Sequence, residues 1–238
     1  FLFIYVTLIK FIYKVKSIFI SIMHNTIKNL IYIEDLIKSK ANLENFPKII
    51  AVSKTFPIEN ILPLIKHGHR HYGENKVQEA LNKWLDLKKK DKNIKLHLIG
   101  RLQTNKVKSA LGIFDYIHSL DSQKLAVKIS EEQIKQQKKP KIFIQVNIGN
   151  EDQKSGINKK DLKNFYKFCS NLNLDIIGTM CIPPNNENTN HYFSEMSMIN
   201  KELNFKDLSM GMSADYIDAV KNNATYIRIG SEIFGKRG

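Results

Sequence analysis

The chain has 238 residues, of which 42% are hydrophobic and 25% charged, a composition that excludes a disordered chain and supplies a sizeable core. Its two cysteines, Cys169 and Cys181, lack the spacing of a disulfide framework or a zinc site, which favours a reducing, cytoplasmic setting and no bound metal. The net charge of +14 comes from lysines scattered along the sequence, so we interpret it as solvated surface rather than as a specific nucleic-acid site.

Residues 1–22, FLFIYVTLIKFIYKVKSIFISI, are apolar and aromatic but carry three lysines and no acid. Lysines within the segment oppose membrane insertion, and a secretory signal places its charges first. Met23 begins a helical pattern, HNTIKNLIYIEDLIKS. We therefore expect Met23 to be the natural start, residues 1–22 to be an N-terminal extension outside the fold, and 23–238 to form the folded domain. A targeting or membrane-surface segment is the alternative for 1–22, and we expect no membrane contact from the domain itself.

From Lys48 onward, short β-branched or apolar runs alternate with longer amphipathic stretches, the pattern of βα units in a parallel sheet. The expected strands are 48–54, 69–75, 95–100, 116–122, 141–147, 175–182, 207–212 and 225–230, and the clearest helices are 57–68, 74–89 and 158–172. Six strands would leave an open sheet, whereas eight close into a barrel. The eight runs predict an α/β fold, a (β/α)8 TIM barrel in a single domain, whose one long loop is 183–190.

Polar residues before two of these helices are candidate N-caps. Asn158 or Asp161 precedes LKNFYKF, and Ser213 precedes ADYIDAV. In each case we expect the side-chain oxygen to accept a hydrogen bond from an unpaired backbone N–H of the first helical turn.

Function in such a barrel gathers at the carboxyl ends of the strands. Lys54 ends the first strand in AVSKTFP, within an apolar run where a charged amine is costly. Burial there lowers the pKa of the amine and makes it a nucleophile able to condense with an aldehyde. The alternative is a lysine that extends from the strand end into water.

The last two expected strands run into turns rich in small residues. LSMGMSADY (208–216) carries Ser213, and IRIGSEIFG (227–235) carries Gly230 and Ser231. Backbone N–H groups and hydroxyls at such turns bind phosphate, and barrels often build their phosphate site after strands seven and eight. Small residues are also common at tight turns, so each segment alone is weak evidence.

Arg228 lies inside the eighth strand, where a buried guanidinium needs a partner. It either approaches a cofactor ring or forms a structural salt bridge. Asn75, His97 and Met180 end or line their strands and are further candidates for contact with a bound ring. The sequence contains no Ser/His/Asp set, HExxH, GxGxxG or P-loop, so hydrolase, zinc-protease and dinucleotide-binding functions have no support.

Eight ordered blocks, taken together, resemble the pyridoxal phosphate homeostasis protein family, also called the YggS/PROSC family. The blocks are AVSKTFP, HYGENKVQEA, LHLIGRLQTNK, IHSLDSQKLA, QVNIGNEDQKSG, IIGTMCIPP, LSMGMSADYIDAV and IRIGSEIFG. The resemblance covers about 23–235. It implies a barrel like the N-terminal barrel of alanine racemase, without that enzyme's C-terminal β domain.

The resemblance also implies the site. Lys54 is the expected Schiff-base lysine for pyridoxal 5'-phosphate (PLP), and Ser213, Gly230 and Ser231 are expected to hold its phosphate. Arg228 is expected at the pyridine nitrogen, and Asn75 matches the family's GEN motif near the cofactor. His97 and Met180 complete the expected cofactor-binding set.

Family members are thought to buffer, carry or deliver PLP, which implies intracellular vitamin B6 homeostasis without catalysis, apo PLP-dependent enzymes as partners, and a monomer. The alternative is a PLP-dependent amino-acid racemase or lyase. Racemisation needs an acid and a base on opposite faces of the substrate, and one of them comes from the domain that this chain is expected to lack.

Overall fold

The structure, a computed structural model, describes residues 23–41, 46–151, 153–184 and 188–236. The prediction about 1–22 concerns residues outside this part of the chain. So does the middle of the loop expected at 183–190.

Eight parallel strands close into one barrel in chain order. Closure rests on the pairing of the first strand with the last, from Lys48 opposite Tyr226 to Ala51 opposite Ile229. The predicted eight-stranded barrel is confirmed, and the open six-stranded sheet is excluded. The strands are β1 (Lys48–Val52), β2 (His71–Glu74), β3 (Lys95–Leu98), β4 (Tyr116–Leu120), β5 (Lys141–Val146), β6 (Asp175–Cys181), β7 (Asp207–Met212) and β8 (Tyr226–Ile229).

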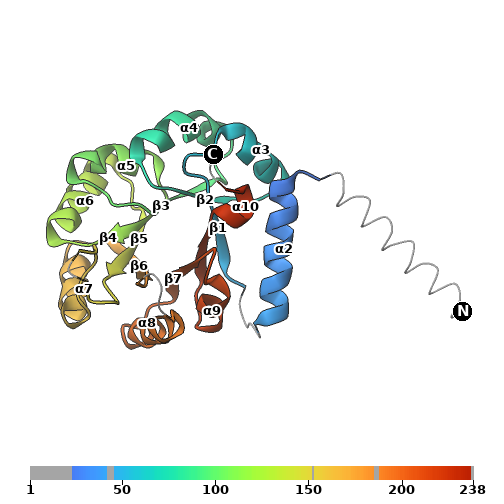
Figure 1. Cartoon of the computed structure of the whole chain (residues 1–238). Helices are drawn as coiled ribbons and strands as arrows, with labels where there is room; N and C mark the ends of the chain where they lie inside the picture. The colour runs from blue at the N-terminus through green and yellow to red at the C-terminus, as the bar shows by residue number, and fades with distance from the viewer. Residues whose placement is uncertain (1–22, 42–45, 152, 185–187, 237–238) are drawn as a thin grey trace, which may run out of the picture.

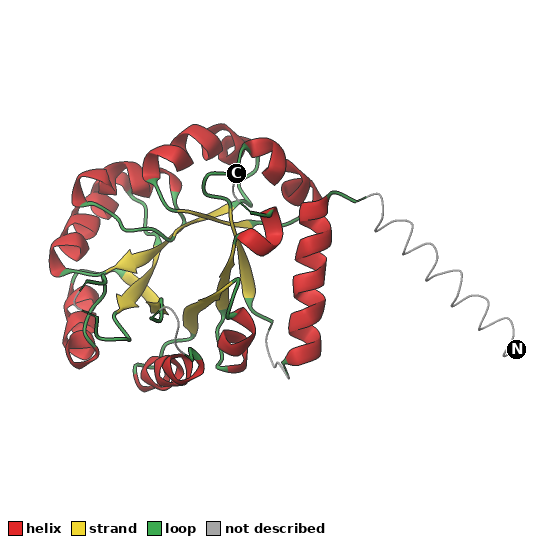
Figure 2. Ribbon diagram, in the orientation of Figure 1, coloured by secondary structure: helices red, strands yellow, loops and turns green. Residues whose placement is uncertain are grey.

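Helices form a ring around the strands (Figure 1), so that each strand is covered on its outer face (Figure 2). They are α2 (Asn25–Lys40), α3 (Ile58–His67), α4 (Val77–Lys90), α5 (Val107–Ile113), α6 (Gln123–Gln136), α7 (Leu162–Asn171), α8 (Asn190–Glu202), α9 (Tyr216–Lys221) and α10 (Ser231–Phe234), with 3-10 turns η1 (Thr104–Lys106) and η2 (Lys159–Asp161). The first and last of these helices meet, because Asn29 Nδ2 donates to the Ile233 carbonyl oxygen at 3.0 Å.

The predicted side-chain caps are wrong. Asn158 precedes η2 and Asp161 precedes α7, but neither side chain accepts a capping bond. At the third site α9 begins only at Tyr216, because Asp215 Oδ1 accepts from the Met212 N–H at 2.6 Å and closes a turn first. This turn leaves the Ser213 hydroxyl outside the helix.

Alternation along each strand divides the core into two parts. Residues on the outer faces pack against the helices in one large apolar cluster. A small inner cluster inside the barrel consists of Ile50, Tyr116, Phe143, Met180 and Tyr226. The interior is therefore filled with side chains, and a ligand has room only at an end of the barrel.

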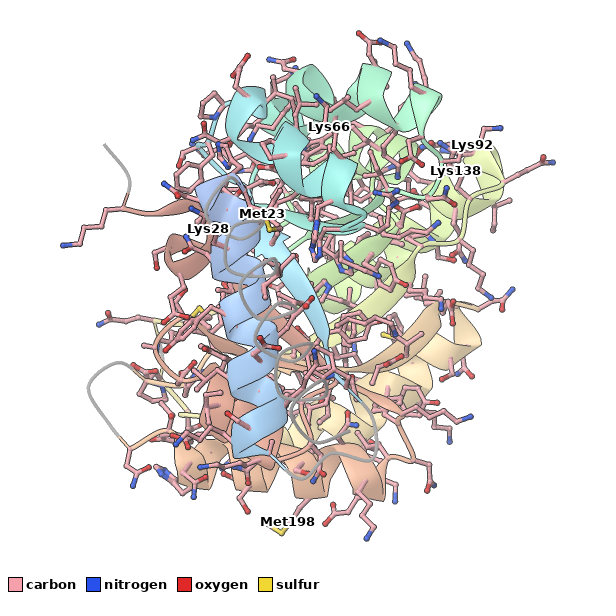
Figure 3. All side chains as sticks on the ribbon, turned by 90° about the vertical axis from the view of Figure 1, so that its right-hand side faces the viewer. Met23, Lys28, Lys66, Lys92, Lys138 and Met198 are labelled. Atoms are coloured by element: carbon pink, nitrogen blue, oxygen red, sulfur yellow. The ribbon has the colours of Figure 1, made fainter. Side chains whose placement is uncertain are left out.

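The basic residues lie on several sides of the molecule. In Figure 3 the labelled Lys28, Lys66 and Lys92 lie well apart from one another. These three agree with the interpretation of the charge as solvated surface, whereas five other lysines line one pocket at the amino end of the barrel. No helix in the described part of the chain is both long and apolar enough to span a bilayer.

Candidate functional site

A pocket of about 610 Å³ opens at the carboxyl ends of the strands, and we call it the carboxyl-end pocket. Its lining contains three basic residues, Lys54, Arg228 and Lys236, and no acidic residue of the described part of the chain. The other lining residues are Val52, Asn75, Ile99, Ile182, Met212, Ser213, Ala214, Gly230 and Ser231. Its volume and mixed lining are typical of a small-molecule site, and the charge favours an anionic ligand.

Six of the eight residues singled out from the sequence line this pocket: Lys54, Asn75, Ser213, Arg228, Gly230 and Ser231. His97 and Met180 do not. Both are fully buried inside the barrel, His97 hydrogen-bonded to two other histidines and Met180 within the inner apolar cluster. Sequence reasoning did not single out Lys236, which follows the last helix and carries no local signal of a site.

Lys54 stands on a strained turn directly after β1. Thr55 has φ 67°, a left-handed conformation that a β-branched residue rarely adopts and that costs about 1–3 kcal/mol. The Thr55 N–H donates to Glu79 Oε1 at 2.6 Å, which ties the turn to α4. Burial alone would raise the pKa of Glu79, but the bonds from Thr55 and Lys83 hold it below its usual range.

Lys83 connects this turn to the neighbouring strand. Its Nζ donates to the Ser53 carbonyl oxygen at 2.8 Å and lies 3.0 Å from both Glu74 Oε1 and Glu79 Oε1. Because Ser53 immediately precedes Lys54, this one amine holds the backbone from which the pocket lysine extends. The ammonium group of Lys83 therefore acts as a clamp under the turn.

Glu74, at the end of β2, is the buried end of this clamp. Its Oε1 accepts from Ser53 Oγ at 2.8 Å and from Trp84 Nε1 at 2.9 Å, and its side chain is fully buried. Its second oxygen, Oε2, is buried with no hydrogen-bond partner. Burial raises the pKa of Glu74, while Trp84 and Lys83 act in the opposite direction.

Arg228 is buried at the floor of the pocket with 4% of its surface exposed. Nη1 donates to Ser209 Oγ at 2.8 Å and Nη2 to the Cys181 carbonyl oxygen at 3.0 Å. Burial lowers the pKa of Arg228, yet a guanidinium keeps its charge in proteins. No ion pair within 4 Å joins it to a carboxylate of the described residues, but the Asp215 carboxylate attracts its charge from farther away and opposes the effect of burial on its pKa.

Two hydroxyls meet on the other side of the pocket. Ser231 Oγ donates to Ser213 Oγ at 3.2 Å, which joins the turn after β7 to the residue that follows Gly230. Gly211, near the end of β7, has φ 88°, and a Cβ added there would lie 2.5 Å from the Ala219 Cβ, so the backbone leading into this turn requires glycine. Two neutral donors beside three cations form a set suited to a phosphate group.

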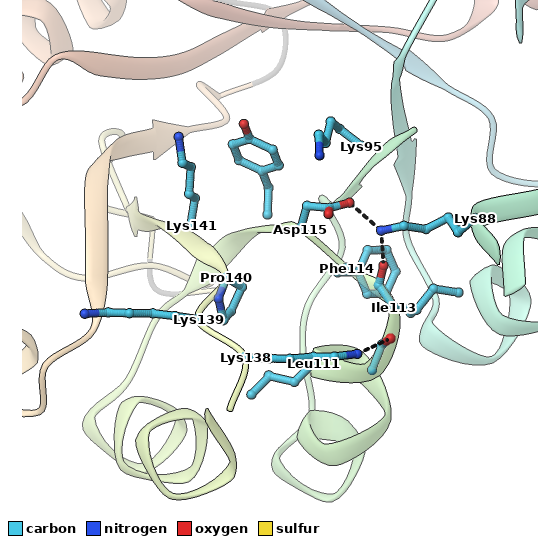
Figure 4. A pocket seen from close by; sticks show the side chains of 12 residues that line it. Lys88, Lys95, Leu111, Ile113, Phe114, Asp115, Lys138, Lys139, Pro140 and Lys141 are labelled. Atoms are coloured by element: carbon cyan, nitrogen blue, oxygen red, sulfur yellow. Dashed lines mark hydrogen bonds and ion pairs between the residues drawn. The ribbon is translucent and has the colours of Figure 1, made fainter. Parts of the chain in front are cut away.

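A second pocket of about 490 Å³ lies at the opposite end of the barrel, and we call it the amino-end pocket. It is also basic, with Lys88, Lys95, Lys138, Lys139 and Lys141 around Asp115. Its amines largely have acceptors within the protein: Lys88 pairs with Asp115, Lys138 donates to the Gly112 carbonyl and Lys139 to Asn173 Oδ1. Figure 4 shows Lys139 extending away from the other side chains.

No group of three or more potential metal ligands occurs in the described ranges, 23–41, 46–151, 153–184 and 188–236. The free thiols Cys169 and Cys181 are both buried. Burial raises the pKa of each to about 12, so neither is a reactive thiolate at neutral pH.

Comparison with known proteins places this geometry in context. The sequence model of the alanine racemase N-terminal domain family matches 35–238. A pyridoxal phosphate homeostasis protein of Aquifex aeolicus is 40% identical over 204 residues, which is 82% of this chain and 89% of that protein. A protein of the same name from Haemophilus influenzae is 34% identical over 91% of this chain and 96% of its own length.

Among solved structures, PipY of Synechococcus elongatus with PLP bound is similar, with a TM-score of 0.79 and 33% identity. The match covers 88% of this chain and all of that chain. The alanine racemase of Clostridium difficile has a TM-score of 0.69 at 16% identity, covering 90% of this chain and 57% of that chain. At that identity the likeness concerns the fold alone.

Proposed function

Because the chain belongs to the alanine racemase N-terminal domain family and, within it, to the pyridoxal phosphate homeostasis proteins, we propose that it binds PLP on Lys54 and buffers or delivers it. One observation carries the proposal. A lysine, a buried arginine hydrogen-bonded to neutral acceptors and two joined serine hydroxyls line one pocket that has no acidic residue in its described lining.

The groups of the pocket match the parts of PLP. The phosphate takes the side with Ser213, Ser231 and Gly230, and the pyridine nitrogen takes the side with Arg228. Lys54 would hold the cofactor covalently, since a lysine amine condenses with an aldehyde with loss of water. Asn75 and the apolar side chains of Val52 and Ile99 border the ring.

The position proposed for Arg228 favours a carrier over an enzyme. A permanent cation at the pyridine nitrogen disfavours protonation of that nitrogen, and an unprotonated ring is a weaker electron sink for carbanion chemistry. This effect on the ring supports a non-catalytic protein rather than a racemase or lyase. We further propose that it is a monomer whose partners are PLP and apo PLP-dependent enzymes, as the family resemblance implies.

The test is the mass of the intact chain after incubation with PLP and borohydride reduction. We expect one phosphopyridoxyl group on the parent chain and on Lys66→Ala, which removes an exposed lysine of α3, and none on Lys54→Ala. An adduct of the same yield on Lys54→Ala would refute the assignment of Lys54.

Delivery needs a separate test. In one arm, a dialysis membrane separates the PLP-loaded protein from an apo PLP-dependent enzyme. In the other arm, the two proteins are mixed in one compartment. Faster recovery of enzyme activity in direct contact supports handover, and equal recovery supports simple release into solution. Turnover of alanine, serine or threonine well above the rate of free PLP would overturn the non-catalytic role.

A further inference from the structure

A continuous chain of hydrogen bonds crosses the interior of the barrel. From Arg228 on β8, Nη1 lies 2.8 Å from Ser209 Oγ on β7, which lies 2.9 Å from His118 Nδ1 on β4. His118 Nε2 lies 2.9 Å from His97 Nδ1 on β3, and His97 Nε2 lies 2.9 Å from His71 Nδ1 on β2. Five strands thus join the carboxyl-end pocket to the amino end of the barrel.

The surroundings hold the two middle rings in place. The ring of His97 stacks on Tyr116 with centroids 4.1 Å apart, and the ring of His118 stacks on Phe143 at 4.3 Å. Both histidines are 0% exposed, as is Ser209, whereas His71 at the amino end is half-buried. Water therefore has access to this chain of hydrogen bonds only at its two ends.

The protonation of the two middle rings follows from their burial. Removal from water holds the pKa of His97 and of His118 well below the usual value, with further lowering by the neighbouring histidines and by Arg228, respectively. Each ring is thus neutral at neutral pH and has one donor and one acceptor nitrogen. The chain can run in only two directions.

Donor counting selects one direction. Arg228 only donates, so it occupies one lone pair of Ser209 Oγ. If His118 also donated to Ser209, the serine proton would have no acceptor among the described residues, at the cost of a buried unpaired donor. The satisfied arrangement has Ser209 donating to His118 Nδ1, and His118 and His97 each donating from Nε2.

We propose that Ser209, His118 and His97 are positioning residues that form a one-way hydrogen-bond chain, which keeps a serine lone pair facing Arg228 and fixes the guanidinium at the pyridine nitrogen. The role toward PLP rests on the proposed function, but the direction of the chain does not. His71, half-buried at the start of β2, ends the hydrogen-bond chain at the amino end of the barrel.

The direction is tested on the full chain without ligand. Long-range ¹H–¹⁵N correlation spectra of the ¹⁵N-histidine-labelled protein at neutral pH distinguish the two tautomers and the charged ring. We expect His97 and His118 to be neutral and protonated on Nε2. Protonation of either ring on Nδ1, or a charged ring, would overturn the proposal.

The positioning role is tested with a matched pair of buried serines. Ser209→Ala breaks the chain, whereas Ser119→Ala removes a buried hydroxyl that has no hydrogen-bond partner. We expect Ser209→Ala to move the His97 and His118 nitrogen signals and to weaken PLP binding about tenfold, the effect of one buried hydrogen bond. Ser119→Ala should leave the His97 and His118 nitrogen signals in place and keep PLP affinity within twofold of the unsubstituted protein.

Unchanged affinity or unchanged histidine signals in Ser209→Ala would refute the positioning role. The two proposals also fail separately. If the tautomers are as expected but no PLP adduct forms, the proposed function is refuted and the hydrogen-bond chain stands. If an adduct forms on Lys54 but the tautomers are reversed, the hydrogen-bond chain is refuted and the proposed function stands.

Discussion

The two ends of the barrel are both basic, but of the two pockets only the amino-end one has an acidic residue, Asp115, in its described lining. At the amino end, Lys88, Lys138 and Lys139 donate to acceptors that the protein itself supplies. At the carboxyl end, Arg228 likewise donates to Ser209 Oγ and the Cys181 carbonyl oxygen, but no acid lines the described wall of the pocket. The comparison teaches that charge alone does not define a site.

The largest effect expected from a single substitution comes from removal of the clamp under Lys54. Lys83→Met leaves the fully buried Glu74 carboxylate without its cation, and we expect the free energy of unfolding to fall by about 3–5 kcal/mol. Urea unfolding measures this loss. Lys88→Met, from the same helix, removes the half-buried pair with Asp115 at the amino end and serves as the control, with a loss of about 1 kcal/mol or less. Equal losses would abolish the contrast between the two ends.

Acid is expected to lower the stability of the fold mainly through four histidines, His69, His71, His97 and His118. Burial, together with neighbouring basic side chains, lowers the pKa of His69 and of His71 to about 4. Burial also holds the pKa of His97 and of His118 well below the usual value. The unfolded chain takes up these protons near pH 6.5 and the folded chain does not. Stability is therefore complete above about pH 6.5 and falls toward pH 4, by about 1.4 kcal/mol per pH unit for each histidine that titrates only on unfolding.

Urea midpoints at pH 7.5 and pH 5 test this dependence. The raised pKa of Glu74 acts in the opposite direction, because the folded state then binds the proton more tightly, so the net slope is smaller than the histidine sum. A midpoint that is equal at the two pH values would contradict the expected net loss of stability at pH 5.

A smaller effect is expected from the two pocket hydroxyls. Ser213→Ala and Ser231→Ala each remove one donor to the phosphate, and we expect PLP binding to weaken about three- to tenfold in each. Equilibrium dialysis measures the affinity. Because the two hydroxyls contact each other, the double variant should lose less than the product of the single effects. Full affinity in both single variants would place the phosphate elsewhere.

The smallest effect is expected at the amino-end pocket. Lys139→Ala and Lys141→Ala remove two of its cations, and we expect PLP affinity to stay within twofold of the parent chain because these amines lie at the other end of the barrel. A loss comparable to that of the serine variants would show that general basicity, rather than the carboxyl-end pocket, attracts the cofactor.

Local signals in the sequence determined the eight strands and the residues at their carboxyl ends. A strand alternates and ends at polar or small residues, so β1 and β8 were found within two residues, and Lys54, Arg228 and Ser231 were assigned to one mouth of one barrel. The local sequence predicts helix caps less well than it predicts strands. The Ser213 prediction is wrong because Asp215 competes for the same turn.

Only the tertiary structure decided which residues share an environment. Ser209, His118 and His97 come from three strands, and nothing in their local sequence indicates that barrel closure places them in one hydrogen-bonded chain. The same closure removed His97 and Met180 from the pocket lining, since the depth of a side chain in a barrel depends on strand stagger as well as on its position within the strand. Strand identity is a short-range property of the sequence, whereas depth and partners are set by the register of all eight strands together.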